Sequence, residues 1–326
     1  MKFNKNVLAI DCKQEIERIC GFIRQQMQSM KREGAVVGLS GGIDSALIAA
    51  LCVEALGKDK VFGLILPEKE SSPVSREFAE KHASKLDIQT EIVDITSTLK
   101  AFGSYKKRDE VIKQILPEYN VNYKIKIVLP PDLLSRDAFN FFKLITEDEE
   151  GNRKSIRLKK KTANGIVAAT NTKQRIRMLH LYYFAEEKNY FVCGTTNKSE
   201  TMQGFFVKYG DGGVDIEPIA HLYKMQVFQL AEYTGVIKEI IERAPSPDTY
   251  SLPVDDEEFF FRMPLDTLDL LLYAWENKIS LVDICAVMEL TEEQVKRAFR
   301  DFTAKSDASR HARKMPPSLK ADNSKY

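Results

Sequence analysis

A short apolar run that ends in a Ser-Gly-Gly turn constrains the fold of this chain more than any other feature. Residues 35–39 are apolar and rich in valine, and the turn at 40–42 leads directly into an Ala- and Leu-rich stretch that reaches Leu56. The short run is typical of a buried strand, and the longer stretch is typical of a helix. A second apolar run at 61–66 completes a β-α-β unit, which predicts a parallel sheet.

The same alternation continues along much of the chain. It predicts an opening amphipathic helix at 15–31, a helix and a strand at 75–86 and 90–95, and another pair at 172–187 and 190–193. Further helices are predicted at 222–234, 265–275, 281–288 and 292–302. We therefore predict one α/β domain over residues 1–326, a doubly wound parallel sheet with helices on both faces and a helical C-terminal part.

Segment 96–170 interrupts this alternation. It is charged, it contains Pro130 and Pro131, and an acidic run precedes Gly151 and Asn152. Structureless loops of this length are uncommon in compact domains, so we predict an inserted subdomain with a hairpin turn at 151–152. Partner docking, a lid and a stability element are equally open as its role. The basic tail, 307–326, should be mobile unless it docks.

Composition excludes several classes of function. Lys and Arg (48) nearly balance Asp and Glu (47), so we expect no nucleic-acid or membrane partner. No stretch approaches the ~20 apolar residues that span a bilayer. The five cysteines are scattered without a CxxC pair, which indicates free thiols in a reducing compartment. We expect a cytoplasmic protein.

The Ser-Gly-Gly turn has the properties of a phosphate-binding loop. A turn between a strand and a helix N-terminus leaves several N–H groups directed at one point, where the helix dipole favours an anion. We expect Gly41 and Gly42 to adopt positive φ so that the backbone can approach the ligand, and the hydroxyls of Ser40 and Ser45 to add hydrogen bonds. The predicted nucleotide-binding residues here are Gly38, Ser40, Gly41, Gly42, Ile43, Asp44 and Ser45.

Asp44 predicts a divalent cation. A carboxylate beside phosphates would repel them unless a divalent cation lay between the two, so Asp44 predicts Mg²⁺ that bridges to the polyphosphate. The loop is not of the Walker type, because no Gly-Lys pair followed by Ser or Thr comes after it. The alternative is a plain helix cap after a tight turn. The strand before the loop and the Asp-Ser pair within it favour the nucleotide site.

Downstream motifs select one family among the ATP pyrophosphatases that share SGGIDS. They are NTKQRIRM at 171–178, GTTNKSE at 194–200, KYGDGGVDIEP at 208–218 and PSPD at 245–248. In this order the chain resembles the ammonia-dependent NAD synthetases, apart from segment 96–170. The resemblance implies amidation of nicotinate adenine dinucleotide (deamido-NAD) through an acyl-adenylate, with release of AMP and pyrophosphate.

The resemblance also implies roles for residues near ATP. Glu200 would bind Mg²⁺ opposite Asp44, and Thr195, Lys224 and Ser246 would contact ATP. Asp211 would orient the nicotinate or accept the ammonia proton, which makes Asp44, Asp211 and Lys224 the candidate catalytic residues. The segment after the second predicted strand, 66–70, contains one basic residue, Lys69, as the candidate for a contact with adenine.

Deamido-NAD would be bound by a second set of residues, namely Arg175, Arg177, Lys208, Asp215 and His311. Arg175 and Arg177 lie half a turn apart on a helix, so only one of them can face a given ligand squarely. The family implies a homodimer. We see no room for an amide-hydrolysing domain before Ile16, so ammonia would be used free or be supplied by a separate glutaminase.

Other interpretations remain open at this stage. Each motif alone is also compatible with a structural role: the two arginines as surface charges, GDGG as a hairpin turn, and the aromatic run 259–261 as core or as a lid. The acceptor could be another carboxylate, such as a sugar acid, or the chain could sense nucleotides without turnover. A helix-turn-helix at 280–300 is disfavoured by the balanced charge.

Overall fold

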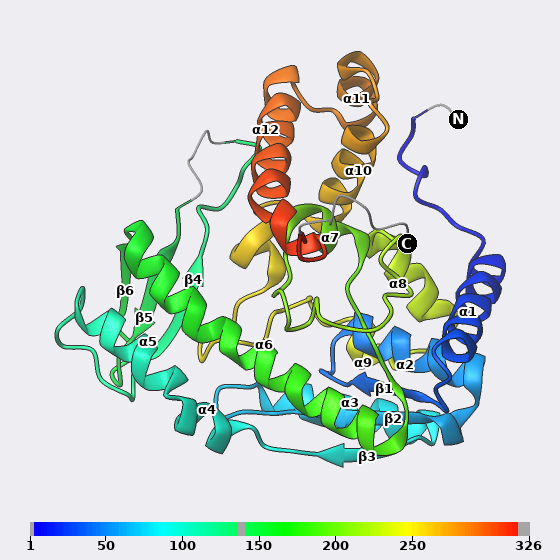
Figure 1. The fold of residues 1–326 in the computed structure, drawn as a ribbon. Helices are drawn as coiled ribbons and strands as arrows, with labels where there is room; N and C mark the ends of the chain where they lie inside the picture. Colours follow the sequence, from blue (N-terminus) through cyan, green and yellow to red (C-terminus); the bar gives the residue numbers. More distant parts are fainter. Residues whose placement is uncertain (1–2, 136–140, 319–326) are drawn as a thin grey trace.

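A parallel sheet forms the centre of the computed structural model, which describes residues 3–135 and 141–318 (Figure 1). Its strands lie in the order β3-β2-β1-β7 and every neighbouring pair is parallel. They are β1 (Ala35–Gly38), β2 (Val61–Ile65), β3 (Gln89–Ile92) and β7 (Phe191–Cys193). The α/β class predicted from the sequence is confirmed.

Helices cover both faces of this sheet, because successive side chains of a strand point to opposite sides. Ala35 and Val37 pack on the face that carries α1 (Cys12–Ser29), α2 (Ile43–Leu56), α3 (Pro73–Leu86) and α8 (Lys224–Tyr233). Val36 packs on the opposite face with α4 (Thr96–Phe102) and α6 (Lys160–Lys188). The sheet is therefore doubly wound.

Two predicted elements differ from the structure. The helix expected at 172–187 already begins at Lys160, where a Cβ on Gly165 would lie only 2.9 Å from Val111 of α5 (Ser104–Lys113). Residues 160–171 favour a helix only weakly by their own sequence, and close packing against α5 stabilises the helix there. The strand expected at 90–95 spans Gln89–Ile92, and all its residues are exposed at the sheet edge.

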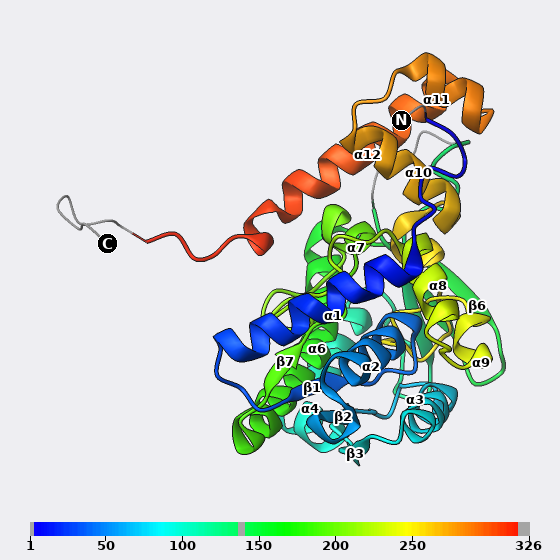
Figure 2. The same cartoon turned by 90° about the vertical axis from the view of Figure 1, so that its right-hand side faces the viewer.

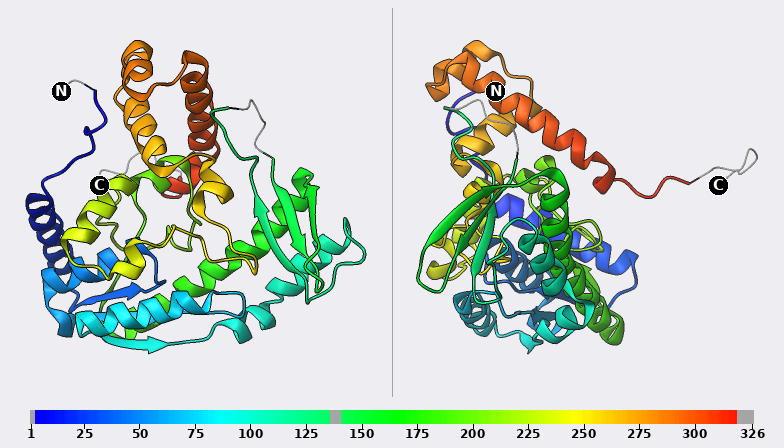
Figure 3. Two further views of the ribbon diagram at one scale, coloured as in Figure 1. Left: turned by 180° about the vertical axis from the view of Figure 1, so that it is seen from behind. Right: turned by 90° about the vertical axis from the view of Figure 1, so that its left-hand side faces the viewer.

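Segment 96–170 contains a second, antiparallel sheet in the order β4-β5-β6 (Figure 3). Its strands are β4 (Lys124–Val128), β5 (Lys143–Glu147) and β6 (Arg153–Arg157). The predicted hairpin joins β5 to β6, where Asp148 N donates to Asn152 O at 3.1 Å and Gly151 has φ +85°. Seen from behind, this sheet and the C-terminal helices lie on different sides of the parallel sheet.

Three C-terminal helices pack around their own apolar cluster. They are α10 (Leu265–Glu276), α11 (Leu281–Met288) and α12 (Glu292–Ser309), and α12 extends beyond the predicted 292–302 (Figure 2). The start of the basic tail forms η3 (Arg310–Arg313), and Arg313 donates to Thr201 O at 3.0 Å. This part of the tail docks. Within 3–135 and 141–318, no helix is both long and apolar enough to cross a bilayer.

Short elements complete the chain and surround the carboxyl ends of the parallel strands. They are α7 (Lys198–Gln203), α9 (Lys238–Ile241) and η2 (Glu257–Phe261), whereas η1 (Lys58–Lys60) directly precedes β2 at the opposite end of the strands. Lys198 N donates to Leu222 O at 2.8 Å, which fixes the start of α7 beside the approach to α8.

Candidate active site

A cavity of about 540 Å³ lies beyond the carboxyl ends of β1, β2 and β7. The chain runs from β1 to β2 on one side and returns to β7 on the other, so the cavity lies at the point where the strand order reverses. Ligands bind at this place in doubly wound sheets. Ser40 and Asp44 line it from the glycine loop, and Gly194 and Thr195 line it from the end of β7.

The glycine loop is shaped by its own hydroxyls. Ser40 N donates to Ser45 Oγ at 3.2 Å, Ser45 Oγ donates to Gly42 O at 2.9 Å, and Gly42 N donates to Ser40 Oγ at 3.3 Å. Within the described residues, the amides of Ile43 and Asp44 make no hydrogen bond, as expected at a helix N-terminus. Both residues line the cavity, so these amides can bind a phosphate.

Only one of the two loop glycines takes the conformation predicted for both. Gly41 has φ +73°, and a Cβ there would lie 2.1 Å from Ser75 O, so only glycine fits. Gly42 is extended, with φ −96°, and its role is the N-cap of α2. Gly41 itself faces α3 and does not line the cavity.

Asp44, Glu200 and Lys224 meet in the cavity from three helix N-termini. Lys224 Nζ donates to Asp44 Oδ2 and lies 3.3 Å from Glu200 Oε1. Asn197, which the motif reading did not single out, donates to Asp44 Oδ1 at 3.0 Å and caps the helix that presents Glu200. The predicted second acidic group therefore does lie opposite the first, with an ammonium between them.

Burial and charge pairing shift the pKa values of Glu200 and Lys224 in opposite directions. Burial raises the pKa of Glu200, against the opposing effect of the Lys224 charge. Burial alone would lower the pKa of Lys224, but Asp44 and Glu200 raise it well above its usual value. Lys224 thus stays protonated and is held as a fixed positive charge at the phosphate site.

Asp256 is a third carboxylate that sequence reasoning missed. It is 5% exposed, it lines the cavity, and its Oδ1 has no hydrogen-bond partner within the described residues. Burial raises its pKa to about 7, with Lys224 opposing the shift. The acidic run at 255–258 was the only available signal, and nothing in its spacing separates Asp256 from its neighbours.

Asp211 and Arg177 line another part of the same cavity. Burial raises the pKa of Asp211 to about 6, although Val207 N, 2.8 Å from its Oδ1, opposes the shift. Arg177 donates to Leu66 O at 3.1 Å and to Gln174 Oε1 at 2.8 Å. GDGG is indeed a turn, and this turn presents Asp211 to the cavity.

The remaining candidates for the dinucleotide lie outside this cavity. Arg175 donates to Lys208 O at 3.2 Å, and Lys208 Nζ donates to His311 O at 3.2 Å. Asp215 accepts from Tyr182 Oη at 3.1 Å and from Val192 N at 2.7 Å. Arg175 and Arg177 therefore face different directions, as their helical spacing predicts.

Several further expectations can be placed in the structure. Ser246 lines the cavity, whereas Lys69 packs over the Tyr105 ring at 4.0 Å and does not. The aromatic run 259–261 is divided between the cavity and the core. Phe259 and Phe260 line the cavity, and Phe261 is 2% exposed in the C-terminal core.

Comparisons with known proteins agree with this geometry. A model of the NAD synthase family matches residues 15–129 and 145–316, so it leaves out only 130–144 of segment 96–170. The chain is 42% identical to the NH(3)-dependent NAD(+) synthetase of Mesorhizobium japonicum, over 95% of this chain and 97% of that protein. It is 36% identical to the Thermotoga maritima protein of the same name, over 85% of this chain and 95% of that protein.

A solved structure is similar along nearly the whole chain. It is an NH3-dependent NAD synthetase from Campylobacter jejuni in complex with the nitrate ion, 27% identical, with a TM-score of 0.63 over 96% of this chain and 100% of that one. The family match, the relatives and the arrangement of the cavity all lead to one conclusion. The chain belongs to the NAD synthase family.

Proposed function

We propose that the chain amidates deamido-NAD to NAD with ATP and ammonia, and that the cavity at the glycine loop is where ATP reacts. The main support is that the free amides of the loop, two carboxylates and a buried lysine meet in one cavity, at the point where the strand order of the sheet reverses. These groups suit a polyphosphate and its cation. Ammonia would enter free or from a separate glutaminase.

We propose Mg²⁺ as the cation, held by Asp44 and Glu200. Carboxylate oxygens are the ligands that Mg²⁺ prefers, and it usually keeps water and substrate phosphates as its other ligands. Among the described residues, no group of three or more acidic, His or Cys side chains could hold a metal alone. Phosphate oxygens would therefore complete the coordination. A bound Mg²⁺ would neutralise charge on the phosphates and on the leaving pyrophosphate.

The residues of the chain act mainly by positioning and by charge. The nicotinate carboxylate attacks the α-phosphate of ATP and pyrophosphate leaves, after which ammonia displaces AMP from the acyl-adenylate. The amides after Gly42 and the Lys224 ammonium stabilise negative charge on the phosphates, and Arg177 binds the acceptor. Asp211 accepts the proton that the attacking ammonia loses.

The product identifies the acceptor. With ATP, Mg²⁺ and ¹⁵N-ammonium, the protein should convert deamido-NAD to NAD that contains ¹⁵N, with AMP formed in equal amount, as measured by mass spectrometry. Sugar acids in place of deamido-NAD should yield no AMP. AMP formation with a sugar acid alone would favour the other amidotransferase, and ATP binding without pyrophosphate release would indicate a sensor.

Asp44→Asn should fold normally and lower kcat/KM by about a hundredfold or more, because a metal-assisted step loses several kcal/mol with its bridging ligand. Asp283→Asn is a matched control in the first turn of α11, far from the cavity, and should keep full activity. Steady-state kinetics with deamido-NAD would measure both. Near-normal turnover by Asp44→Asn would remove this carboxylate from the reaction.

The pH profile tests Asp211. Because its pKa is raised to about 6, the carboxyl group is neutral below that pH and ionised above it. At a fixed concentration of unprotonated ammonia, kcat/KM should rise as the pH passes through about 6. Asp211→Asn should lose this rise and about a hundredfold in kcat. The role as proton acceptor is wrong if the variant keeps both the rate and the profile.

We also propose a homodimer formed through the outer face of α6. Leu179 and Tyr183 of α6 are 64% and 61% exposed, and Tyr209, from the turn that lines the same depression as Leu179, is 61% exposed. Such exposure is unusual for a group of large apolar side chains. A partner on this face would cover the depression that Arg175 lines.

Leu179→Glu should convert the dimer to a monomer in sedimentation velocity, since the new charge would be buried at the interface. Val282→Glu changes an equally exposed apolar residue, 73% exposed on α11, and should leave the dimer intact. A wild-type monomer, or dissociation by both variants alike, would contradict this assignment.

A further inference from the structure

The segment 245–258 forms one wall of the cavity without regular structure of its own before η2. Residues 245–250 and Asp256 line the cavity, and Ser246 is the proposed ATP contact. Within the segment, Asp256 N donates to Pro245 O at 2.9 Å and Asp248 N donates to Ser246 Oγ at 3.2 Å. At the start of η2, Glu258 N also donates to Asp255 Oδ1 at 2.7 Å. Three hydrogen bonds within the segment are too few to order such a stretch. Its position must come from contacts with other elements.

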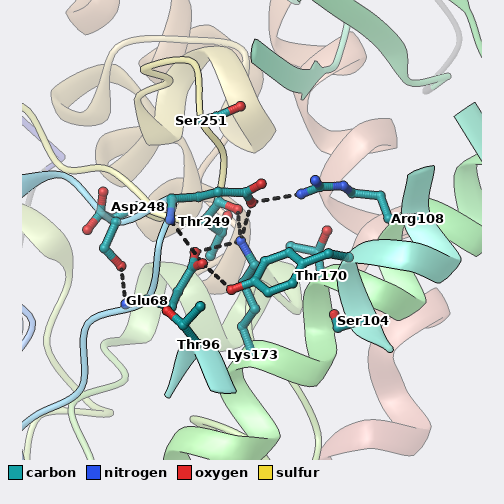
Figure 4. Close-up of polar contacts among 12 residues, drawn as sticks. Glu68, Thr96, Ser104, Arg108, Thr170, Lys173, Asp248, Thr249 and Ser251 are labelled. Atoms are coloured by element: carbon teal, nitrogen blue, oxygen red, sulfur yellow. Dashed lines mark hydrogen bonds and ion pairs between the residues drawn. The ribbon is translucent and has the colours of Figure 1, made fainter. Parts of the chain in front are cut away.

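The first such contact is a fully buried lysine. Lys173 of α6 is 1% exposed, and its Nζ donates to Glu68 Oε1 at 2.7 Å, to Glu70 Oε2 at 2.7 Å and to Thr249 O at 2.8 Å (Figure 4). An ammonium has three protons, and each of them has an acceptor here. Lys173 thus joins the segment to the residues that follow β2.

The two glutamates are themselves held from α5. Tyr105 Oη donates to Glu68 Oε2 at 2.6 Å, and Arg108 donates to Glu70 Oε2 at 2.7 Å. Burial would raise the pKa of Glu70, but Arg108 and Lys173 lower it to about 2, so it is ionised at neutral pH. Breaking one member of a buried ionic group leaves the others uncompensated. Lys173 is therefore fixed in one position, and with it Thr249.

The second contact is strand β4 of the antiparallel sheet. Leu252 N donates to Ile125 O at 3.0 Å, and Ile125 N donates to Ser251 Oγ at 2.8 Å. Lys126 Nζ donates to Pro253 O at 3.1 Å and pairs with Glu258 at 2.6 Å. The segment thus lies along β4 much as an additional strand would.

A third contact reaches the segment from the start of α3. Ser72 N donates to Asp248 Oδ1 at 2.9 Å, and Asp248 has φ +44°, a conformation that few non-glycine residues adopt. Surrounding contacts must stabilise such a residue. The segment is therefore fixed at 248 and 249, within the stretch 245–250 that lines the cavity, and along 251–253, directly after that stretch.

We propose that Lys173 and β4 are positioning elements that order the segment 245–258 before ATP arrives and so set the affinity for ATP. Lys173 does not itself line the cavity and acts through Thr249, which does. When a wall of a binding site is ordered in advance, the ligand does not supply the free energy of ordering it. This gives the antiparallel sheet a role as a support for the site, and it rests on the proposed function only in naming ATP as the ligand.

Lys173→Met should raise KM for ATP at least about tenfold, which corresponds to about 1.4 kcal/mol, while kcat at saturating ATP changes by less than about threefold. In the ligand-free protein, amide hydrogen exchange should accelerate at 246–253. Lys173→Arg retains a charged donor and should restore part of the affinity. A purely structural role would lower stability without this separation of KM from kcat.

Ser104→Ala is the matched control. Ser104 is buried beside the same ionic group and donates to Ala169 O at 2.6 Å, and within the described residues its side chain makes no hydrogen bond with 245–258 (Figure 4). It should lose stability with unchanged KM for ATP and unchanged exchange at 246–253. Equal effects of Ser104→Ala and Lys173→Met would mean that the changes reflect general destabilisation and would overturn the proposal.

Ser251→Ala is a second test that does not depend on the buried charges. It removes the acceptor of Ile125 N at a half-buried position and should also raise KM and accelerate exchange. If Lys173→Met does not fold, Ser251→Ala provides the test of the proposal. An unchanged KM for ATP and unchanged exchange at 246–253 in this variant would reject the proposal. The affinity for ATP, measured by calorimetry, and the rate of amide hydrogen exchange can both be measured without catalytic turnover. A wild type that binds ATP but does not amidate deamido-NAD would therefore refute the proposed function alone.

Discussion

The ammonium of Lys224 lies between the carboxylates of Asp44 and Glu200, and the rest of the site depends on this arrangement. Buried charges are tolerated only in pairs, so three helix N-termini are held together at one end of the parallel sheet. The glycine loop joins β1 to the first of these helices and is thereby fixed beside the charges. A cavity that suits a polyphosphate follows from this geometry.

The sequence predicts well what local patterns determine. The apolar run at 35–39, the glycine turn and the alternation after it specify the parallel sheet. The motifs contain Asp44 and Glu200, the family resemblance adds Lys224, and the structure brings these three side chains together. The features that the sequence does not predict depend on tertiary contacts. The first half of α6 forms because Gly165 lets α5 approach, and Asp256 reaches the cavity only because the segment before η2 is drawn across it.

Sequence order also cannot show which residues share a surface. Arg177 and Asp211 line the cavity, whereas Arg175, Lys208, Asp215 and His311 do not. The same applies to the antiparallel sheet, whose role was open from its composition. Its strand β4 contacts the wall of the cavity directly, through hydrogen bonds with residues 251–253 that span more than a hundred positions in the chain.

The most direct test of the central arrangement is the binding of Mn²⁺, in place of Mg²⁺, followed by electron paramagnetic resonance. Without nucleotide, the Lys224 ammonium lies against both carboxylates and competes with a cation for their oxygens, so the protein should bind Mn²⁺ weakly. With a non-hydrolysable ATP analogue, phosphate oxygens complete the coordination and Mn²⁺ should bind stoichiometrically. Binding that is equally strong without nucleotide, or equally weak with it, would contradict the account.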